Sequence, residues 1–429
     1  RQSRQIYSLI PLTAREPLRT KPAIMPLTPQ GVKYEIEITG INRLNPAPRQ
    51  GNFPFGGKFA IVPAMPYDGI PDDAIDLHSL RRVLVIKLRH HGDVLLTSPV
   101  FTVLKNRAAH LEIDALVYRD TADMLTLHPA ISQVLTIDRD WKRQGPLAQA
   151  RAEWGLLSML RSRGYDLVIH LTEHPRGAWI RRLCGARYGV ARRMRDRGAL
   201  WRNSFTHLFL TPPPGVKRHA VEVNLDALRR IGISPIPQEK ALSLIPGVAA
   251  DTRVDQLLAE NGLGRGNFIH LHPTSRWLFK CWPMEKVASL ASILAQAGHS
   301  VVVTAAPDPR ELALVKQITE QLEQPIINLA GQLSLKELAA LTGRAKLFVG
   351  VDSAPMHIAA AMGTPTVAIF GPSGDWEWGP WQVRHRLVAT DMRCRPCGLD
   401  GCGGSKISEC LTTLPVNAVL QAVDDLLKP

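Results

Sequence analysis

Four short segments of this 429-residue sequence carry side chains of the kinds that hold phosphate or move protons. The first is the turn His91-Gly92-Asp93, which follows an aliphatic run at residues 83–88. Gly92 permits close backbone approach or a positive φ. Asp93 suits two roles, a helix N-cap or a catalytic carboxylate, and its position alone does not separate them.

The second segment, residues 271–276, also follows an apolar run and precedes a helical pattern. The hydroxyls of Thr274 and Ser275 and the ammonium group of Lys280 are groups that bind a diphosphate. A helix-start loop with a solvent-exposed lysine is the alternative that spacing leaves open. The segment therefore indicates a phosphate site only in combination with the others.

The third segment, residues 350–357, ends a strand and starts a helix at Pro355. Free backbone N–H groups at a helix start attract phosphate. Asp352 is too acidic for that task, and we expect it to accept hydrogen bonds from sugar hydroxyls. His357 is by default a packed helix residue. The fourth segment, residues 370–373, is a turn that contains Gly371.

Alternating strand and helix patterns must position these four segments. The first series has strands at 83–88, 111–118, 134–137 and 165–171, with helices near 94–105, 122–127, 147–163 and 220–231. The second has strands at 268–271, 300–304, 326–329, 347–351 and 366–370, with helices near 285–297, 310–321, 335–342, 355–362 and 416–427. Such β-α-β repeats predict two α/β halves with parallel sheets. Ligands bind at the carboxyl ends of such strands, so the segments face a shared cleft.

The domain organisation follows from the same patterns. Residues 1–80 hold eleven of the 33 prolines, which disfavour helices and central strands. We expect an extended or disordered arm there, with one short strand at 32–38. An N-terminal Rossmann-like domain follows at 81–245, and a C-terminal one at 246–429.

The net charge of +14 predicts an anionic partner. Between residues 176 and 202 Asp196 is the only acid beside nine arginines: Arg176, Arg181, Arg182, Arg187, Arg192, Arg193, Arg195, Arg197 and Arg202. A solvated face is the plainer explanation. The sequence lacks recognisable nucleic-acid modules, which favours an acidic substrate or a membrane surface. It also lacks an apolar run of 18 residues and a secretory signal, so we expect a cytoplasmic protein.

Four of the six cysteines cluster near the C-terminus with irregular spacing: Cys394, Cys397, Cys402 and Cys410. In a cytosolic protein such a cluster more often binds metal than forms disulfides. A structural zinc site and a reduced, packed loop both remain open.

From Arg82 to Leu427 the sequence resembles glycosyltransferase family 9, the lipopolysaccharide heptosyltransferases. The resemblance rests on His91-Gly92-Asp93 with residues 83–88 and 97–99, on residues 272–274 with Lys280 and 282–283, and on residues 350–361 with 370–372. Within the family, residues 89–93 and 276–282 most resemble the branch that adds the third inner-core heptose.

The resemblance implies a GT-B fold and an inverting, metal-independent transfer of heptose from ADP-L-glycero-D-manno-heptose to the lipopolysaccharide inner core. It makes Asp93 the general base and places Thr274, Ser275 and Lys280 on the diphosphate. Asp352, Ser353 and His357 would line the heptose and phosphate site, with Gly371 beside them. Glu311, or alternatively Asp308, would bind the ribose.

The acceptor and the anionic inner face of the inner membrane would meet the basic surface, and we expect acceptor contacts from His91, Arg176, Arg192 and Arg193. No cofactor is expected. Three alternatives remain: transfer of the first or second core heptose, a nucleotide-sugar-binding protein without transferase activity, and a nucleotide-sugar epimerase on the same scaffold.

Overall fold

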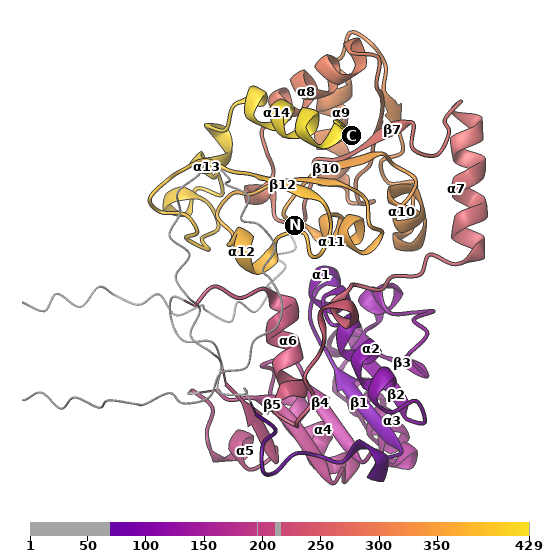
Figure 1. The fold of residues 1–429 in the computed structure, drawn as a ribbon, viewed down its shortest axis with the longest axis vertical. Coiled ribbons are helices and arrows are strands. Elements are labelled where there is room, and N and C mark those ends of the chain that lie inside the picture. Colours follow the sequence, from indigo (N-terminus) through magenta and orange to yellow (C-terminus); the bar gives the residue numbers. More distant parts are fainter. Residues whose placement is uncertain (1–68, 195, 211–215, 429) are drawn as a thin grey trace, which may run out of the picture. The chain divides into compact units, whose positions relative to one another are not determined.

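The computed structural model describes residues 69–194, 196–210 and 216–428, shown in colour in Figure 1. They form two six-stranded sheets in which every strand pairing is parallel. The first sheet contains β1 (Arg82–Ile86), β2 (Glu112–Tyr118), β3 (Gln133–Ile137), β4 (Leu167–His170), β5 (Tyr188–Arg192) and β6 (His207–Phe209). The second contains β7 (Phe268–His272), β8 (Ser300–Val303), β9 (Ile327–Asn328), β10 (Leu347–Val351), β11 (Thr366–Ile369) and β12 (His385–Val388).

Both sheets use the same strand order. It is β3-β2-β1-β4-β5-β6 in the first, and β9-β8-β7-β10-β11-β12 in the second. The order reverses between β1 and β4 and again between β7 and β10, and these reversals are where doubly wound sheets bind ligands. The predicted α/β fold class is therefore confirmed.

Helices connect the strands in each half. In the first half they are α1 (His91–Leu95), α2 (Ser98–Arg107), α3 (Pro146–Arg163), α4 (Arg176–Cys184), α5 (Ala199–Arg202) and α6 (Ala220–Arg229). In the second they are α7 (Val248–Glu260), α8 (Met284–Gln296), α9 (Pro309–Thr319), α10 (Leu335–Thr342), α11 (Ala354–Ala361), α12 (Asp375–Trp378), α13 (Glu409–Thr412) and α14 (Val416–Leu427). Short 3-10 helices are η1 (Leu77–Ser79), η2 (Arg119–Met124), η3 (Arg139–Arg143), η4 (Pro237–Lys240), η5 (Leu278–Lys280) and η6 (Cys402–Gly404).

Some elements differ from those the sequence predicts. The single helix expected at 94–105 is two helices, because Pro99 lies in the first turn of α2 and cannot continue α1. The helix expected near 122–127 is the 3-10 helix η2. The strands β5, β6 and β12 were not predicted, since they are short and interrupted by arginine or histidine.

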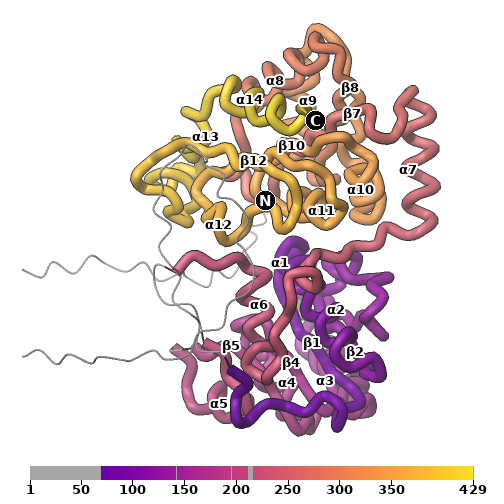
Figure 2. Tube along the Cα trace, viewed as in Figure 1, coloured from indigo at the N-terminus to yellow at the C-terminus, as the bar shows by residue number. Residues whose placement is uncertain are grey.

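The predicted arm of residues 1–80 is too long at its C-terminal end. Residues 1–68, with the expected strand at 32–38, lie outside the described residues. Ile75, Leu77 and Leu80, however, are buried in the core of the first half. The domain boundary predicted at 245–246 stays a prediction. Close to it, α7 begins at Val248 and packs against α10, and Figure 2 shows the course of the chain there.

The core lies on both faces of each sheet. Along β1, Val83 and Val85 belong to one buried cluster while Leu84 and Ile86 belong to another on the opposite face. Near-continuous aliphatic strands of this type are what a parallel sheet covered on both sides requires. The strands are thereby fixed, and the loops at their carboxyl ends are held in place.

Acid is expected to destabilise the protein below neutral pH. Burial lowers the pKa of five histidines from 6.5 to about 4: His128, His170, His219, His272 and His357. Between pH 6.5 and about 4, these histidines bind protons in the unfolded chain but stay neutral in the folded chain. The free energy of unfolding therefore falls as the pH drops from 6.5 to 4, by up to about 1.4 kcal/mol per pH unit for each histidine.

Denaturant titrations at pH 7.5, 6, 5 and 4 would measure this slope. In His128 the Nδ1 atom accepts a hydrogen bond from the Ala130 backbone N–H at 3.1 Å, which an asparagine oxygen can replace. His128→Asn should therefore fold and show a slope smaller by one proton. An unchanged slope in that variant would contradict the burial of a neutral imidazole.

Candidate active site

Asp93 lies in the first turn of α1, at the carboxyl end of β1. The N-cap of α1 is His90, so the N-cap role that the sequence left open for Asp93 is not the one it has. The Asp93 carboxylate is half-buried and makes no hydrogen bond or ion pair with another described residue. Its negative charge nevertheless acts on Lys87, His90 and His357. Asp93 is thus a carboxylate kept free at the ligand-binding edge of the first sheet.

Gly92 brings α1 of the first half against α11 of the second. A Cβ atom at Gly92 would lie 2.8 Å from Cδ2 of His357, so only glycine fits without moving that ring. The two helices pack against each other at this point. Asp93 and His357, predicted from separate halves of the sequence, therefore belong to one site.

Gly92→Ala is expected to destabilise the protein by roughly 1–3 kcal/mol, because the added methyl group overpacks against a buried ring. Displacement of the His357 ring should also lower the rate of turnover. Gly155→Ala on α3 is the matched control: a Cβ there has nothing within 4 Å, and alanine should stabilise the helix by about 0.5–1 kcal/mol. Thermal unfolding of both variants would test this, and equal effects would contradict it.

Thr274 and Glu311 meet in the second half. Thr274, after the end of β7, donates a hydrogen bond from Oγ1 to Oε2 of Glu311 at 2.7 Å, and both side chains are buried. The alternative ribose acid, Asp308, instead accepts the Arg310 and Glu311 backbone N–H groups as the N-cap of α9. Ser275 is also buried, and its hydroxyl accepts from the Trp277 N–H. Glu311 therefore belongs to the Thr274 loop, and Asp308 does not.

Lys280 is paired with Asp352. The Lys280 Nζ atom lies 2.6 Å from Oδ2 of Asp352, and the exposed fractions of the two side chains are 23% and 7%. The pair joins η5, after β7, to the loop after β10. A solvent-exposed lysine, the alternative for Lys280, is not what the structure has. The pair places a positive and a negative group side by side at the switch point of the second sheet.

Ser353 and Gly371 complete the second half of the site. Ser353 is the N-cap of α11, and its hydroxyl donates to the carbonyl of Val351 and leaves the first N–H groups of the helix uncapped by side chains. Gly371 is buried against Leu411, and its carbonyl accepts a hydrogen bond from Nε of Arg395. The start of α11 and the turn after β11 therefore lie at the same carboxyl edge.

The pKa of His357 reflects the charges of Asp93, Lys280 and Asp352 around it. Burial lowers its pKa to about 4, the negative charges of Asp352 and Asp93 oppose that shift, and the charge of Lys280 adds to it. Its Nδ1 atom is buried and has no hydrogen-bond partner within the described part of the chain. A neutral imidazole with a free ring nitrogen thus lies among the predicted base and the predicted donor-binding pair.

The predicted acceptor residues do not form one cluster. His91 is half-buried and its Nε2 lies 2.8 Å from the carbonyl oxygen of Asp120. Arg192 pairs with Glu173 at 3.0 Å, while its own Nε is buried without a partner among the described residues. Arg193 is exposed, and Arg176 pairs with Glu153. Arg176 lines a cavity at the carboxyl end of the strands.

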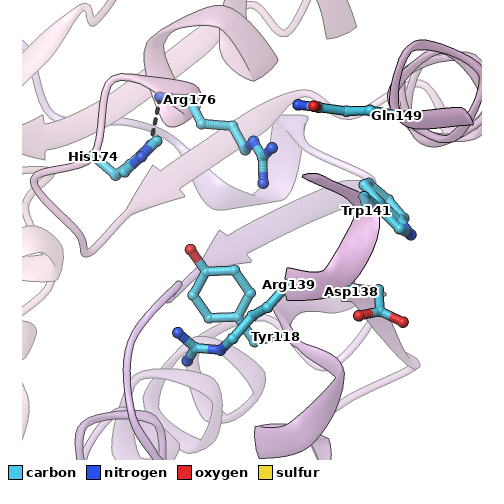
Figure 3. Close-up of a pocket in the computed structure, with 7 residues that line it drawn as sticks. All are labelled: Tyr118, Asp138, Arg139, Trp141, Gln149, His174 and Arg176. Carbon is cyan, nitrogen blue, oxygen red and sulfur yellow. Dashed lines mark hydrogen bonds between the residues drawn. The ribbon is translucent and has the colours of Figure 1, made fainter. Parts of the chain in front are cut away.

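That cavity has a volume of about 210 Å³ and lies at the carboxyl edge of the first sheet. Figure 3 shows its lining: Tyr118, Asp138, Arg139, Trp141, Gln149, His174 and Arg176. The guanidinium of Arg139 stacks 3.7 Å from the centre of the Tyr118 ring and donates to the carbonyl of Arg89, just before α1. Aromatic rings beside arginine and carboxamide groups suit an acidic sugar.

Two further residues near Asp93 were missed. Lys87 follows β1 directly and donates to Leu171 O at 3.0 Å and to Asn224 Oδ1 at 3.2 Å, and burial lowers its pKa. Glu377 on α12 has a raised pKa because of burial, and the charge of Asp93 raises it further. A lysine ending an aliphatic run was the available signal for Lys87, whereas Glu377 had none.

Hydrogen bonds to backbone carbonyls join the two halves around this site. Lys336 on α10 donates to the carbonyl of Thr126 at 2.9 Å. His219 contacts the carbonyl of Gly379 at 2.9 Å and stacks on the Trp381 ring. Trp381 in turn donates from Nε1 to the carbonyl of Lys240 at 2.7 Å.

The four clustered cysteines carry free thiols, of which Cys410 is buried and Cys394 and Cys397 are exposed. Within the described residues no three potential ligand side chains lie close enough to hold a metal ion. The zinc site and the reduced, packed loop both stay predictions for this cluster. None of the described helices is long and apolar enough to cross a bilayer.

Comparison with known proteins agrees with this geometry. The sequence profile of glycosyltransferase family 9 (heptosyltransferase) matches residues 154–406. Lipopolysaccharide heptosyltransferase 3 of Escherichia coli is 35% identical over 343 residues, covering 79% of this chain and 97% of that protein. Its counterpart in E. coli strain K12 is 37% identical over 297 residues, covering 68% of this chain and 83% of that protein.

Solved structures share the fold. A glycosyl transferase of family 9 from Veillonella parvula DSM 2008 superimposes with a TM-score of 0.70 at 23% identity, over 83% of this chain and 99% of that one. E. coli heptosyltransferase WaaC with ADP-2-deoxy-2-fluoro heptose superimposes with a TM-score of 0.63 at 21% identity, over 80% of this chain and 99% of that one.

Two doubly wound halves with polar loops at their carboxyl edges define the GT-B fold. The sequence profile and the curated relatives make the chain a glycosyltransferase. More narrowly, the chain belongs to glycosyltransferase family 9.

Proposed function

We propose that this enzyme transfers L-glycero-D-manno-heptose from its ADP-linked donor to the inner core of lipopolysaccharide, and that it adds the third heptose. The observation that carries the proposal is the meeting of Asp93 with His357, Lys280 and Asp352, one group from the first half and three from the second. The similarity to lipopolysaccharide heptosyltransferase 3 supports the acceptor class.

The reaction we propose is an inverting displacement. The acceptor hydroxyl attacks the anomeric carbon of the donor while the bond from that carbon to the diphosphate oxygen breaks. Asp93 takes the proton of the attacking hydroxyl, since its carboxylate is free of other partners. Negative charge grows on the departing diphosphate, and the Lys280 ammonium with the N–H groups at the start of α11 can stabilise it. Asp352 and the ring of His357 would orient the heptose.

We propose that no metal or cofactor takes part, because Lys280 and the helix start supply the positive groups the leaving diphosphate needs. The donor's ribose would bind at Glu311, which lies with Thr274 in the same loop. Activity that survives EDTA treatment would support this, and activity restored only by added Mg²⁺ would overturn it.

We place the acceptor against the first half, with its acidic sugar in the cavity that Arg139, Trp141 and Arg176 line. We also infer that the enzyme works at the inner face of the inner membrane, where its acceptor is made. The excess of arginine between residues 176 and 202 suits both anionic partners.

Arg193→Glu is expected to raise the KM for the acceptor at least several-fold, because it reverses an exposed positive charge directly after the carboxyl end of β5, on the edge where we place the acceptor. The KM for the donor should not change. Arg253→Glu, an equal charge reversal on exposed α7, should alter neither constant. If both variants behaved alike, the basic run would be only a solvated face.

The deciding experiment is mass spectrometry of transfer reactions with ADP-heptose and a panel of truncated core acceptors. We expect product only with acceptors that already carry two heptoses, increased in mass by one heptose. Product with shorter acceptors would assign the first or second transfer. Donor turnover without any acceptor would indicate an epimerase, and donor binding without turnover a binding protein.

A further inference from the structure

Helix α3 exposes large apolar side chains. Of its 18 residues only Leu156 and Leu160 are buried. Leu147 and Trp154 are 86% and 75% exposed. These two residues are seven positions apart, so they share one face of the helix. The side of α3 that faces away from the core is therefore partly apolar, as is the side that packs against the core.

Helix α4 continues this apolar surface. Trp179 and Leu183, four positions apart, are 51% and 44% exposed, and α3 packs against α4. A groove of about 340 Å³ lies between the two helices and includes Leu157, Trp179 and Leu183 in its lining. We call the surface formed by Leu147, Trp154, Trp179 and Leu183 the α3–α4 face.

The two helices of the α3–α4 face carry mostly positive charge, although Arg163 is paired with Glu112 and Asp114. The helices contain six arginines and a single acid, Glu153, which is paired with Arg176. Arg151 and Arg161 are exposed and lie three positions before and seven after Trp154, so they flank it on the same side of α3. Tryptophan and leucine bordered by arginine is the composition of helices that lie in the boundary of an anionic bilayer.

We propose that the α3–α4 face docks on the surface of a membrane that contains anionic lipid. Trp154 and Trp179 lie at the level of the lipid headgroups, and Arg151 and Arg161 contact lipid phosphates. A bilayer that contains anionic lipid binds apolar rings and positive charge together. It therefore explains both the exposed tryptophans and the arginines that flank them. The inference rests on the proposed function, since a lipid-anchored acceptor gives such a surface its use.

The docking surface adjoins the cavity proposed for the acceptor sugar. His174 and Arg176 line both the groove between α3 and α4 and the cavity at the carboxyl edge of the first sheet. An acceptor whose lipid part stays in the bilayer can therefore present its sugars to the cavity directly. The face and the cavity form one continuous path for such a substrate.

Flotation of the full chain with vesicles tests the proposal. Wild-type protein should float with vesicles of phosphatidylcholine and phosphatidylglycerol and much less with phosphatidylcholine alone. Trp154→Ser/Trp179→Ser should weaken binding by roughly tenfold or more. Arg151→Glu/Arg161→Glu should remove the preference for anionic vesicles. Val248→Ser, at a position on α7 that is 84% exposed, is the matched control and should bind as wild type does.

Residues 1–68 are identical in all these proteins, so differences between them belong to the α3–α4 face. Binding unchanged in both double variants would overturn the proposal. So would a dimer in solution that the tryptophan double variant converts to monomer, because a second copy would then be the occupant. Each double variant should keep wild-type turnover of a water-soluble, deacylated acceptor, which also shows that it is folded. Heptose transfer absent from every protein would instead refute the proposed function and leave the vesicle result standing.

Discussion

Asp93→Asn is expected to lower kcat by roughly 10²–10⁴-fold, which is the usual contribution of a general base. The amide has the shape of the carboxylate but cannot take the proton of the acceptor hydroxyl. Because the Asp93 carboxylate has no partner among the described residues, the substitution breaks no internal contact, and the fold should be unaffected. Steady-state kinetics with donor and acceptor at saturation would measure the loss.

Donor binding separates this role from a structural one. Calorimetry should give Asp93→Asn the same Kd for ADP as wild type, and thermal unfolding should give the same Tm. Asp123→Asn, the same change at an exposed carboxylate of η2, should keep full activity. If the loss in kcat were matched by an equal loss of ADP affinity, Asp93 would be a binding residue and the assignment as base would fall.

Lys280→Ala should lower kcat/KM by about 10²–10³-fold, because a cation aimed at the growing negative charge of the leaving group is lost. It should also destabilise the fold by roughly 1–3 kcal/mol, since Asp352 is left as a buried carboxylate without its partner. The two effects have different origins, and the ion pair lets them be separated.

Lys280→Ala/Asp352→Asn removes the stranded charge. We expect chemical denaturation to show most of the lost stability restored in this double variant, while activity stays low. Lys316→Ala on α9 is the control, because its side chain is 74% exposed and pairs with Glu320 only at 3.6 Å. Recovery of activity together with stability would mean that Lys280 acts by supporting the fold and not by binding the diphosphate.

The sequence predicted those parts of the site that lie close to a strand end. Thr274, Asp352 and Gly371 come one or two residues after a strand and Asp93 comes seven residues after β1, and parallel topology places such ends at one edge. The order of strands and loops along the chain was enough to predict where these four residues lie. The partnership of Lys280 with Asp352 was not predictable, because it spans 72 residues.

The cavity proposed for the acceptor was harder to predict for the same reason. It combines Tyr118, Trp141 and Arg176, which come from three separate segments and carry no shared motif. The arginine-rich run indicated an anionic partner but not which guanidinium groups are already occupied. Arg176 pairs with Glu153 and Arg192 pairs with Glu173. Neither acid is a sequence neighbour of its arginine, and neither belongs to a motif.

The bonds that join the two halves have an evolutionary consequence. Lys336, His219 and Trp381 each bond to a carbonyl of the opposite half, at Thr126, Gly379 and Lys240. A carbonyl is present whatever the side chain, so these bonds place no demand on the side chain at the accepting position. Thr126 and Lys240 can therefore diverge while the bonds persist, whereas Gly379 is restricted separately, because a Cβ there would lie 2.5 Å from the Asp375 carbonyl oxygen. At these three bonds selection therefore acts on the donor side chains, and the contact between Gly92 and His357 adds a separate constraint. Elsewhere in the first half, changes of side chain leave these three bonds to the second half intact.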